Sequence, residues 1–129
     1  MNILDENILE DQRQLLSGWR VPFRQVGYEV GRTGMKDDEV IPLLLGLRRP
    51  TFFTHDAGFF KSGLCHSRYC LVYLHVEQEE AATFLRRLLR HPELNTQAKR
   101  MGLVIRLSHA GLSVWRLHAE EAAFVDWLK

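Results

Sequence analysis

The apolar positions of the chain fall into short runs separated by segments of helical periodicity. Three short runs rich in β-branched, aromatic or leucine side chains predict buried strands: residues 2–4, 51–54 and 70–76. A looser alternation of apolar and polar residues predicts a further strand within residues 19–26. Residues 103–107 and 112–117 flank a polar turn, a pattern that predicts a C-terminal β-hairpin.

Between these runs the apolar residues recur at three- and four-residue spacing, which predicts helices. The clearest helix covers residues 77–90, with glutamates in its first turns and arginines in its last, as the helix dipole favours. Another helix is expected to stop at Gly18, and a third to begin at Asp37 or Asp38 and end near Leu47. Shorter segments predict a loop or irregular helix at 57–63 and an amphipathic tail at 119–128.

This alternation of strands and helices predicts an α/β domain with a mostly parallel central sheet flanked by helices. The 129 residues suit one domain, so we expect a single domain over residues 1–129. Apolar residues make up 46% and charged residues 26% of the chain, a balance that argues against disorder. The net charge of +1 is too small to indicate a partner, although arginine supplies thirteen of the seventeen cationic side chains.

The remaining compositional features favour a reducing, aqueous environment. The only cysteines are Cys65 and Cys70, and their spacing gives no disulfide framework, so we expect free thiols. The N-terminal residues lack the pattern of a signal peptide, and no apolar stretch approaches the ~18–20 residues of a membrane span. We therefore expect a cytoplasmic protein without membrane contact.

Acidic residues recur where parallel strands are expected to end. Asp5 follows the first predicted strand, Asp56 follows the strand at 51–54, and residues 37–39 (Asp-Asp-Glu) open the helix between them. Carboxyl ends of parallel strands meet at one edge of a sheet, where ligands bind. Carboxylates gathered there repel one another unless a hard divalent cation such as Mg²⁺ or Mn²⁺ binds between them. The alternative is that each acid is a helix cap, turn or strand-end residue.

The same acids carry a resemblance to a known family. Leu4-Asp5-Glu6-Asn7 after the first strand, Asp37-Asp38-Glu39-Val40-Ile41 at a helix start and Thr54-His55-Asp56 after another strand resemble the PIN-like domains, especially the minimal nucleases related to VapC-type toxins. The resemblance covers residues 1–76 and implies a three-layer fold with a parallel sheet. It also implies a Mg²⁺- or Mn²⁺-dependent ribonuclease that acts on RNA as the toxin of a toxin–antitoxin pair, with an antitoxin protein or a second copy of the chain as partners.

Carried over position by position, the resemblance assigns roles to four acids. Asp5, Glu39 and Asp56 would be catalytic, and Asp38 would join them in binding the metal. Related proteins usually have a further acid two residues after the Asp56 position, where this chain has Gly58. The alternatives are a site that binds its metal weakly, a site that recruits Glu6 or Asp37 in place of the missing acid, and a catalytically inactive PIN-like module that binds RNA or a protein. Acids after the first and third strands also resemble receiver domains, although the other residues expected of that class are missing.

A basic stretch provides a candidate RNA contact. Within residues 86–106 six cationic side chains face a single acid, Glu93, and five of them are predicted to bind the RNA backbone: Arg86, Arg87, Arg90, Lys99 and Arg100. The alternative is a solvated helix face followed by a polar loop. The RNA interpretation depends on whether this stretch borders the acidic edge.

Overall fold

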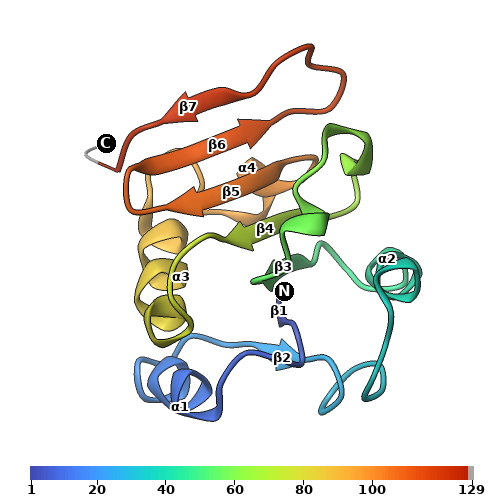
Figure 1. The fold of residues 1–129 in the computed structure, drawn as a ribbon, viewed down its shortest axis with the longest axis vertical. Coiled ribbons are helices and arrows are strands. Elements are labelled where there is room, and N and C mark those ends of the chain that lie inside the picture. Colours follow the sequence, from blue (N-terminus) through green and yellow to red (C-terminus); the bar gives the residue numbers. More distant parts are fainter. Residues whose placement is uncertain (128–129) are drawn as a thin grey trace.

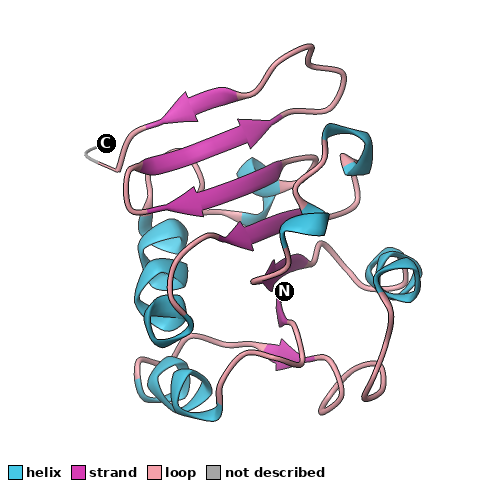
Figure 2. Ribbon diagram, viewed as in Figure 1, coloured by secondary structure: helices cyan, strands magenta, loops and turns pink. Residues whose placement is uncertain are grey.

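A computed structural model describes residues 1–127 as a seven-stranded sheet with helices on both faces (Figures 1 and 2). Five strands are parallel and occupy one side of the sheet, in spatial order β2 (Arg24–Gln25), β1 (Asn2–Leu4), β3 (Thr51–Thr54), β4 (Cys70–Leu74) and β5 (Val104–Ser108). Two antiparallel strands complete it, β6 (Gly111–Trp115) and β7 (Ala123–Val125). The chain is thus an α/β protein with a mostly parallel sheet, as the sequence predicts.

Successive residues of the parallel strands bury their side chains on opposite faces of the sheet, which creates two cores. One face is covered by α1 (Glu10–Gly18) and α3 (Ala81–Arg90), which pack against each other. The other face is covered by α2 (Asp37–Leu45). Phe53 belongs to the first core and its neighbour Phe52 to the second, and neither is exposed to solvent. Both faces are therefore closed, and ligands have access at the two edges where strands begin and end.

Short helical turns complete the connections between these elements. Two 3₁₀ turns, η1 (Ala57–Phe59) and η2 (Ser62–Leu64), occupy the segment predicted as a loop or irregular helix. A third, η3 (Gln78–Glu80), precedes α3, and the short helix α4 (Gln97–Arg100) precedes β5. Within residues 1–127, no helix is long and apolar enough to cross a lipid bilayer.

The structure departs from the sequence prediction in its less regular segments. The strand expected within 19–26 is reduced to the two residues of β2, because Trp19, Val21 and Phe23 pack against the core and do not extend the strand. The helix expected at 77–90 is divided into η3 and α3. The predicted tail contains β7, and its residue Leu128 lies outside the described residues.

The C-terminal strands are part of the main sheet. β5 and β6 pair antiparallel from Val104 opposite Trp115 to Ser108 opposite Gly111. β5 also pairs in parallel with β4, and β6 pairs with β7. These strands therefore extend the central sheet and do not stand apart from it.

Candidate functional site

Asp5 lies at the carboxyl end of β1, in a position fixed by three hydrogen bonds. Its backbone N–H donates to the Phe53 carbonyl at 2.9 Å. Its Oδ2 accepts from the Thr54 hydroxyl at 2.6 Å, and its Oδ1 accepts from the Glu6 backbone N–H at 2.8 Å. Burial raises the pKa of Asp5 above its ordinary value, and the charges of Glu6 and Asp56 raise it further, although the two side-chain hydrogen bonds oppose the shift.

Thr54, the last residue of β3, connects Asp5 to Asp56. While its hydroxyl donates to Asp5, its Oγ1 accepts from the Asp56 backbone N–H at 3.0 Å. Asp56 in turn caps η1 by accepting from the Gly58 backbone N–H at 2.8 Å. Because Thr54 is completely buried, this bridge is rigid and keeps the two acids at the ends of neighbouring strands.

Asp37, the first residue of α2, brings a third carboxylate to the same place. Although Asp37 is exposed, partial desolvation raises its pKa. The negative charge of Asp56 and a side-chain hydrogen bond with it raise the pKa further, followed by the charges of Asp5 and Asp38. The cluster of Asp5, Asp37 and Asp56 therefore carries unrelieved repulsion, and a shared proton or a cation would reduce it.

These three acids line one cavity of about 450 Å³. Its wall is built from the β1–α1 loop, the start of α2, the end of β3 and the start of η3, and comprises Asp5, Glu6, Asn7, Ile8, Leu9, Met35, Asp37, His55, Asp56 and Gln78. The location at the carboxyl edge of the parallel strands is the one that the sequence predicts.

His55 contributes a polar atom without a partner to this wall. Its Nδ1 lies 3.0 Å from the Leu74 carbonyl oxygen, and because a carbonyl only accepts, Nδ1 carries the proton. In the neutral imidazole Nε2 is then an acceptor, and this buried atom has no hydrogen-bond partner among the described residues. In the sequence, the feature that points to His55 is its position next to Asp56, directly after a strand.

The structure does not bring Glu39 into this cluster. Its Oε1 accepts from the Lys36 backbone N–H at 3.1 Å, closing a capping box at the start of α2. Its Oε2 forms an ion pair with Arg32. Asp38 lines a smaller neighbouring hollow together with Asp37, Gly58 and Lys61. Of the three consecutive acids at 37–39, Asp37 is thus the one that joins Asp5 and Asp56, and the sequence prediction named its two neighbours.

Gly58 lies against the acidic cluster. A Cβ atom placed on it would be 3.0 Å from Asp56 Oδ1 and 3.6 Å from Asp37 Oδ2. A carboxylate at this position would therefore lie beside the other acids, and its absence leaves the cluster with one ligand fewer than the resemblance implies.

The donors of the cluster match a divalent cation in chemistry but are not arranged around one. Carboxylate oxygens are the ligands that Mg²⁺ and Mn²⁺ prefer. Within residues 1–127, however, no group of three or more acidic, histidine or cysteine side chains is spaced to hold a metal ion. The Asp5 oxygens are engaged by Thr54 and Glu6, so a cation would require these carboxylates to change partners.

The predicted RNA-binding residues are dispersed and lie mainly away from this pocket. Arg86 stacks over the Trp19 ring at 3.7 Å, and Arg87 lies over the Trp127 ring at 4.4 Å. Lys99 donates to the Pro92 carbonyl at 2.6 Å and to Asn95 Oδ1 at 3.0 Å. None of the five predicted residues lines the acidic pocket.

Arg100 is buried, and its side chain is hydrogen-bonded within the protein. Only 4% of the residue is exposed, and its Nε donates to Thr51 Oγ1 at 3.0 Å while Nη1 donates to the Leu94 carbonyl at 2.8 Å. Burial lowers its pKa. Since Thr51 begins β3, Arg100 is fixed at the amino edge of the sheet and is not available for contact with an RNA backbone.

No family model, curated protein or solved structure matches this chain.

Proposed function

We propose that the chain is a PIN-like, Mg²⁺- or Mn²⁺-dependent ribonuclease whose site is the acidic cluster of Asp5, Asp37 and Asp56. The observation that carries this proposal is the convergence of three carboxylates from three separate elements on one cavity. There burial, and after it the charges of neighbouring acids, raise the pKa of Asp5 and Asp37. Asp37 takes the place that the sequence prediction gave to Glu39.

A divalent cation bound by these acids would neutralise their charge, activate water and stabilise the negative charge that develops on a phosphodiester. The residues of this chain position the site. Thr54 holds Asp5 and Asp56 in place through its hydroxyl. His55 offers its unpartnered Nε2 as an acceptor from a hydroxyl or water close to the cluster.

The proposal extends to the partners expected of this class. RNA is the substrate, an antitoxin protein or a second copy of the chain is the regulatory partner, and the cytoplasm is the location. Arg87 and Arg90 are the members of the predicted basic set that remain exposed on α3. Because neither residue lines the acidic pocket, they would contact the phosphates only of an RNA strand that extends beyond that pocket.

The test is cleavage of a single-stranded RNA in the presence of Mn²⁺ or Mg²⁺ and its inhibition by EDTA. Asp5→Asn, Asp37→Asn and Asp56→Asn should each lower the cleavage rate by about 100-fold or more, because loss of an outer-shell partner of a metal ligand already costs about 10–100-fold. Glu39→Gln is the matched control and should retain the rate, because Glu39 faces Lys36 and Arg32.

Two results would contradict the proposal. One is the absence of any metal-dependent cleavage by the purified chain. The other is a rate for Asp37→Asn equal to that of Glu39→Gln, which would show that the geometry of the cluster has no bearing on activity.

A second function, a non-catalytic RNA- or protein-binding module on the same fold, is favoured by one observation. Gly58 occupies the position beside Asp56 where a further acid would complete the cluster. In that case RNA should bind with equal affinity to the wild type and to the Asp5→Asn, Asp56→Asn double variant, with no cleavage by either.

A further inference from the structure

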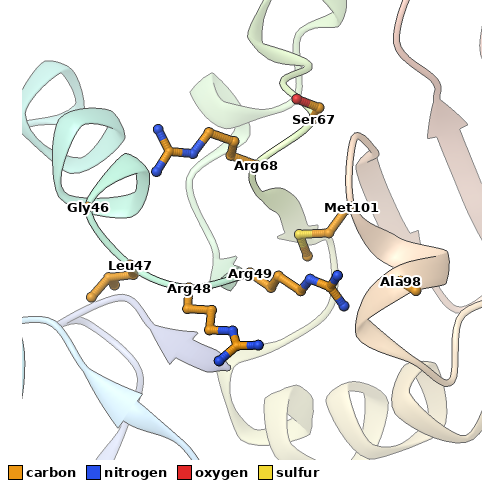
Figure 3. Close-up of a pocket in the computed structure, with 8 residues that line it drawn as sticks. All are labelled: Gly46, Leu47, Arg48, Arg49, Ser67, Arg68, Ala98 and Met101. Carbon is orange, nitrogen blue, oxygen red and sulfur yellow. The ribbon is translucent and has the colours of Figure 1, made fainter.

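A second cavity, of about 610 Å³, lies at the amino edge of the parallel strands (Figure 3). It is formed by the end of α2, the segments that lead into β3 and β4, and α4 with the residue after it. Its wall contains three arginines and no acid, and comprises Gly46, Leu47, Arg48, Arg49, Ser67, Arg68, Ala98 and Met101. We call this cavity the arginine pocket.

The three guanidinium groups of the arginine pocket have no counter-charge in the protein. Within residues 1–127, the side chains of Arg48, Arg49 and Arg68 make no hydrogen bond, ion pair or ring contact. Some arginines elsewhere are engaged, as Arg13 is with two glutamates and Arg32 with Glu39. Other exposed arginines, such as Arg20 and Arg90, also lack a side-chain partner among residues 1–127, but they do not line this cavity. Three unpaired cations around one hollow therefore form a surface whose charge only a bound anion would neutralise.

The three arginine side chains extend in different directions around the hollow. In Figure 3, Arg68 extends toward Gly46, Arg49 toward Ala98, and Arg48 away from both. All three residues are exposed, so their long side chains can turn into the hollow without disturbing the core. Their origin on two different segments means that a single anion can be approached from two sides.

The backbone at Arg49 is unusual for its sequence. Its φ is +49°, in the left-handed region, although it is not glycine and the next residue is Pro50. Arg20 and His118, which do not line the pocket, also have positive φ, so this conformation alone does not mark a site. The Arg49 carbonyl accepts from the Met1 amino group at 3.1 Å, and this contact holds the turn.

We propose that the arginine pocket binds the phosphate group of a ligand through Arg48, Arg49 and Arg68, with the Ser67 hydroxyl as a further donor. Guanidinium groups match phosphate oxygens by paired N–H donors, and each charge-assisted hydrogen bond of this type is stronger than a neutral one. The group belongs either to a small phosphorylated compound or to the backbone of RNA. This site is separate from the acidic pocket and does not depend on catalysis there.

Binding is tested by calorimetry at constant ionic strength with chloride, inorganic phosphate, pyrophosphate and a short single-stranded RNA with a 5′-hydroxyl end. EDTA is included so that RNA is not cleaved. Binding of phosphate or pyrophosphate but not of the RNA would identify a small phosphorylated ligand. Binding of the RNA would identify its phosphodiester backbone as the ligand. Either result supports the proposal if substitution of the pocket arginines weakens the binding.

Arg48→Gln and Arg68→Gln should each weaken binding by about tenfold, as expected for loss of one charge-assisted hydrogen bond. Arg20→Gln removes the same charge from an exposed arginine that does not line the pocket, and should leave affinity unchanged. Amide chemical shifts of the wild type during the phosphate titration give a second measurement that needs no variant. They should change at residues 46–49 and 67–68.

The proposal is overturned if none of the phosphate compounds binds above the chloride background. It is also overturned if Arg20→Gln weakens binding as much as Arg48→Gln does, because attraction would then depend on net charge. Shift changes confined to residues that do not line the pocket would also overturn it.

Discussion

The two edges of the parallel sheet carry opposite charges that are held in different ways. At the carboxyl edge, Asp5 and Asp56 are fixed by hydrogen bonds to the buried Thr54. At the amino edge, one arginine, Arg100, is buried and fixed by Thr51, whereas the arginines of the arginine pocket are exposed and unpaired. Strands of four or five residues separate the two edges by about 15 Å.

The short strand β3 provides a hydrogen-bond partner for a charged side chain at each edge. β3 begins with Thr51 and ends with Thr54, and each threonine is a hydrogen-bond partner of a charged side chain 49 positions away in the sequence. The carboxyl edge carries acids that are held in place by hydrogen bonds. The amino edge carries one buried, hydrogen-bonded arginine and three exposed arginines without a side-chain partner. The following predictions test this contrast, beginning with the largest expected effect on stability.

Replacing the buried Arg100 should destabilise the protein much more than replacing an exposed arginine at the same edge of the sheet. We expect Arg100→Met to lower the free energy of unfolding by about 3 kcal/mol, because Thr51 Oγ1 and the Leu94 carbonyl lose their buried donor. Arg48→Met, on the exposed part of the same edge, should change it by no more than about 0.5 kcal/mol. Urea unfolding of both variants provides the measurement, and equal losses would contradict the distinction between them.

The two ends of β3 can be compared with the same substitution. Thr54→Val and Thr51→Val each remove one completely buried hydroxyl at nearly constant volume, and each should lower the free energy of unfolding by about 1–3 kcal/mol. Only Thr54→Val should also raise the pKa of Asp5 further, because it removes the hydrogen bond that favours the ionised carboxylate.

Carboxyl chemical shifts followed by NMR between pH 3 and 8 would report the Asp5 pKa in both variants. Thr51→Val is the control, since Thr51 is hydrogen-bonded to Arg100 at the other edge. A lower Asp5 pKa in Thr54→Val, or the same increase in both variants, would be inconsistent with the bridge.

The smallest effect concerns the pH dependence of stability. The pKa of Asp5 is raised from its ordinary value of 3.8, so the folded protein binds this proton at higher pH than the unfolded chain does. As pH falls through the raised pKa toward 3.8, Asp5 should therefore increase the free energy of unfolding. Asp37, whose pKa is also raised, should act in the same direction.

Comparison with the variants isolates this contribution from that of other carboxylates. The free energy of unfolding of the wild type minus that of Asp5→Asn should increase on acidification from pH 7 toward pH 4, and Asp37→Asn should give the same sign. A difference that stays constant or decreases would show that the pKa of these acids is not raised by folding, whether through burial or through repulsion.

The sequence alone predicts where Asp5 and Asp56 lie, but not which of the acids at 37–39 lies beside them. Asp5 and Asp56 were predicted because each directly follows a buried strand, and a strand end places its next residue at the sheet edge. The choice among residues 37–39 depends on how α2 is rotated against the sheet. Consecutive helical residues point about 100° apart, so one acid faces the cluster and another closes the cap.

The basic residues illustrate a second limit. Arg100 follows a polar segment, and α4 is too short for periodicity to reveal which face it buries. The arginines of the pocket are adjacent in the sequence only at Arg48 and Arg49, and Arg68 approaches them because β3 and β4 pair in parallel. A pattern in the sequence therefore does not distinguish a buried cation from an exposed one.

The sequence by itself determined the α/β class, the main strands and helices, and the strand ends at which Asp5 and Asp56 lie, because these follow from local periodicity. Only the tertiary structure decided which charges are paired. Thr54 reaches Asp5 and Thr51 reaches Arg100 across 49 residues, while Glu39 is neutralised by Arg32. Whether a charge is paired depends on partners that packing brings together from distant positions. For this reason only the fold distinguished Asp37 from its acidic neighbours and revealed the arginine pocket.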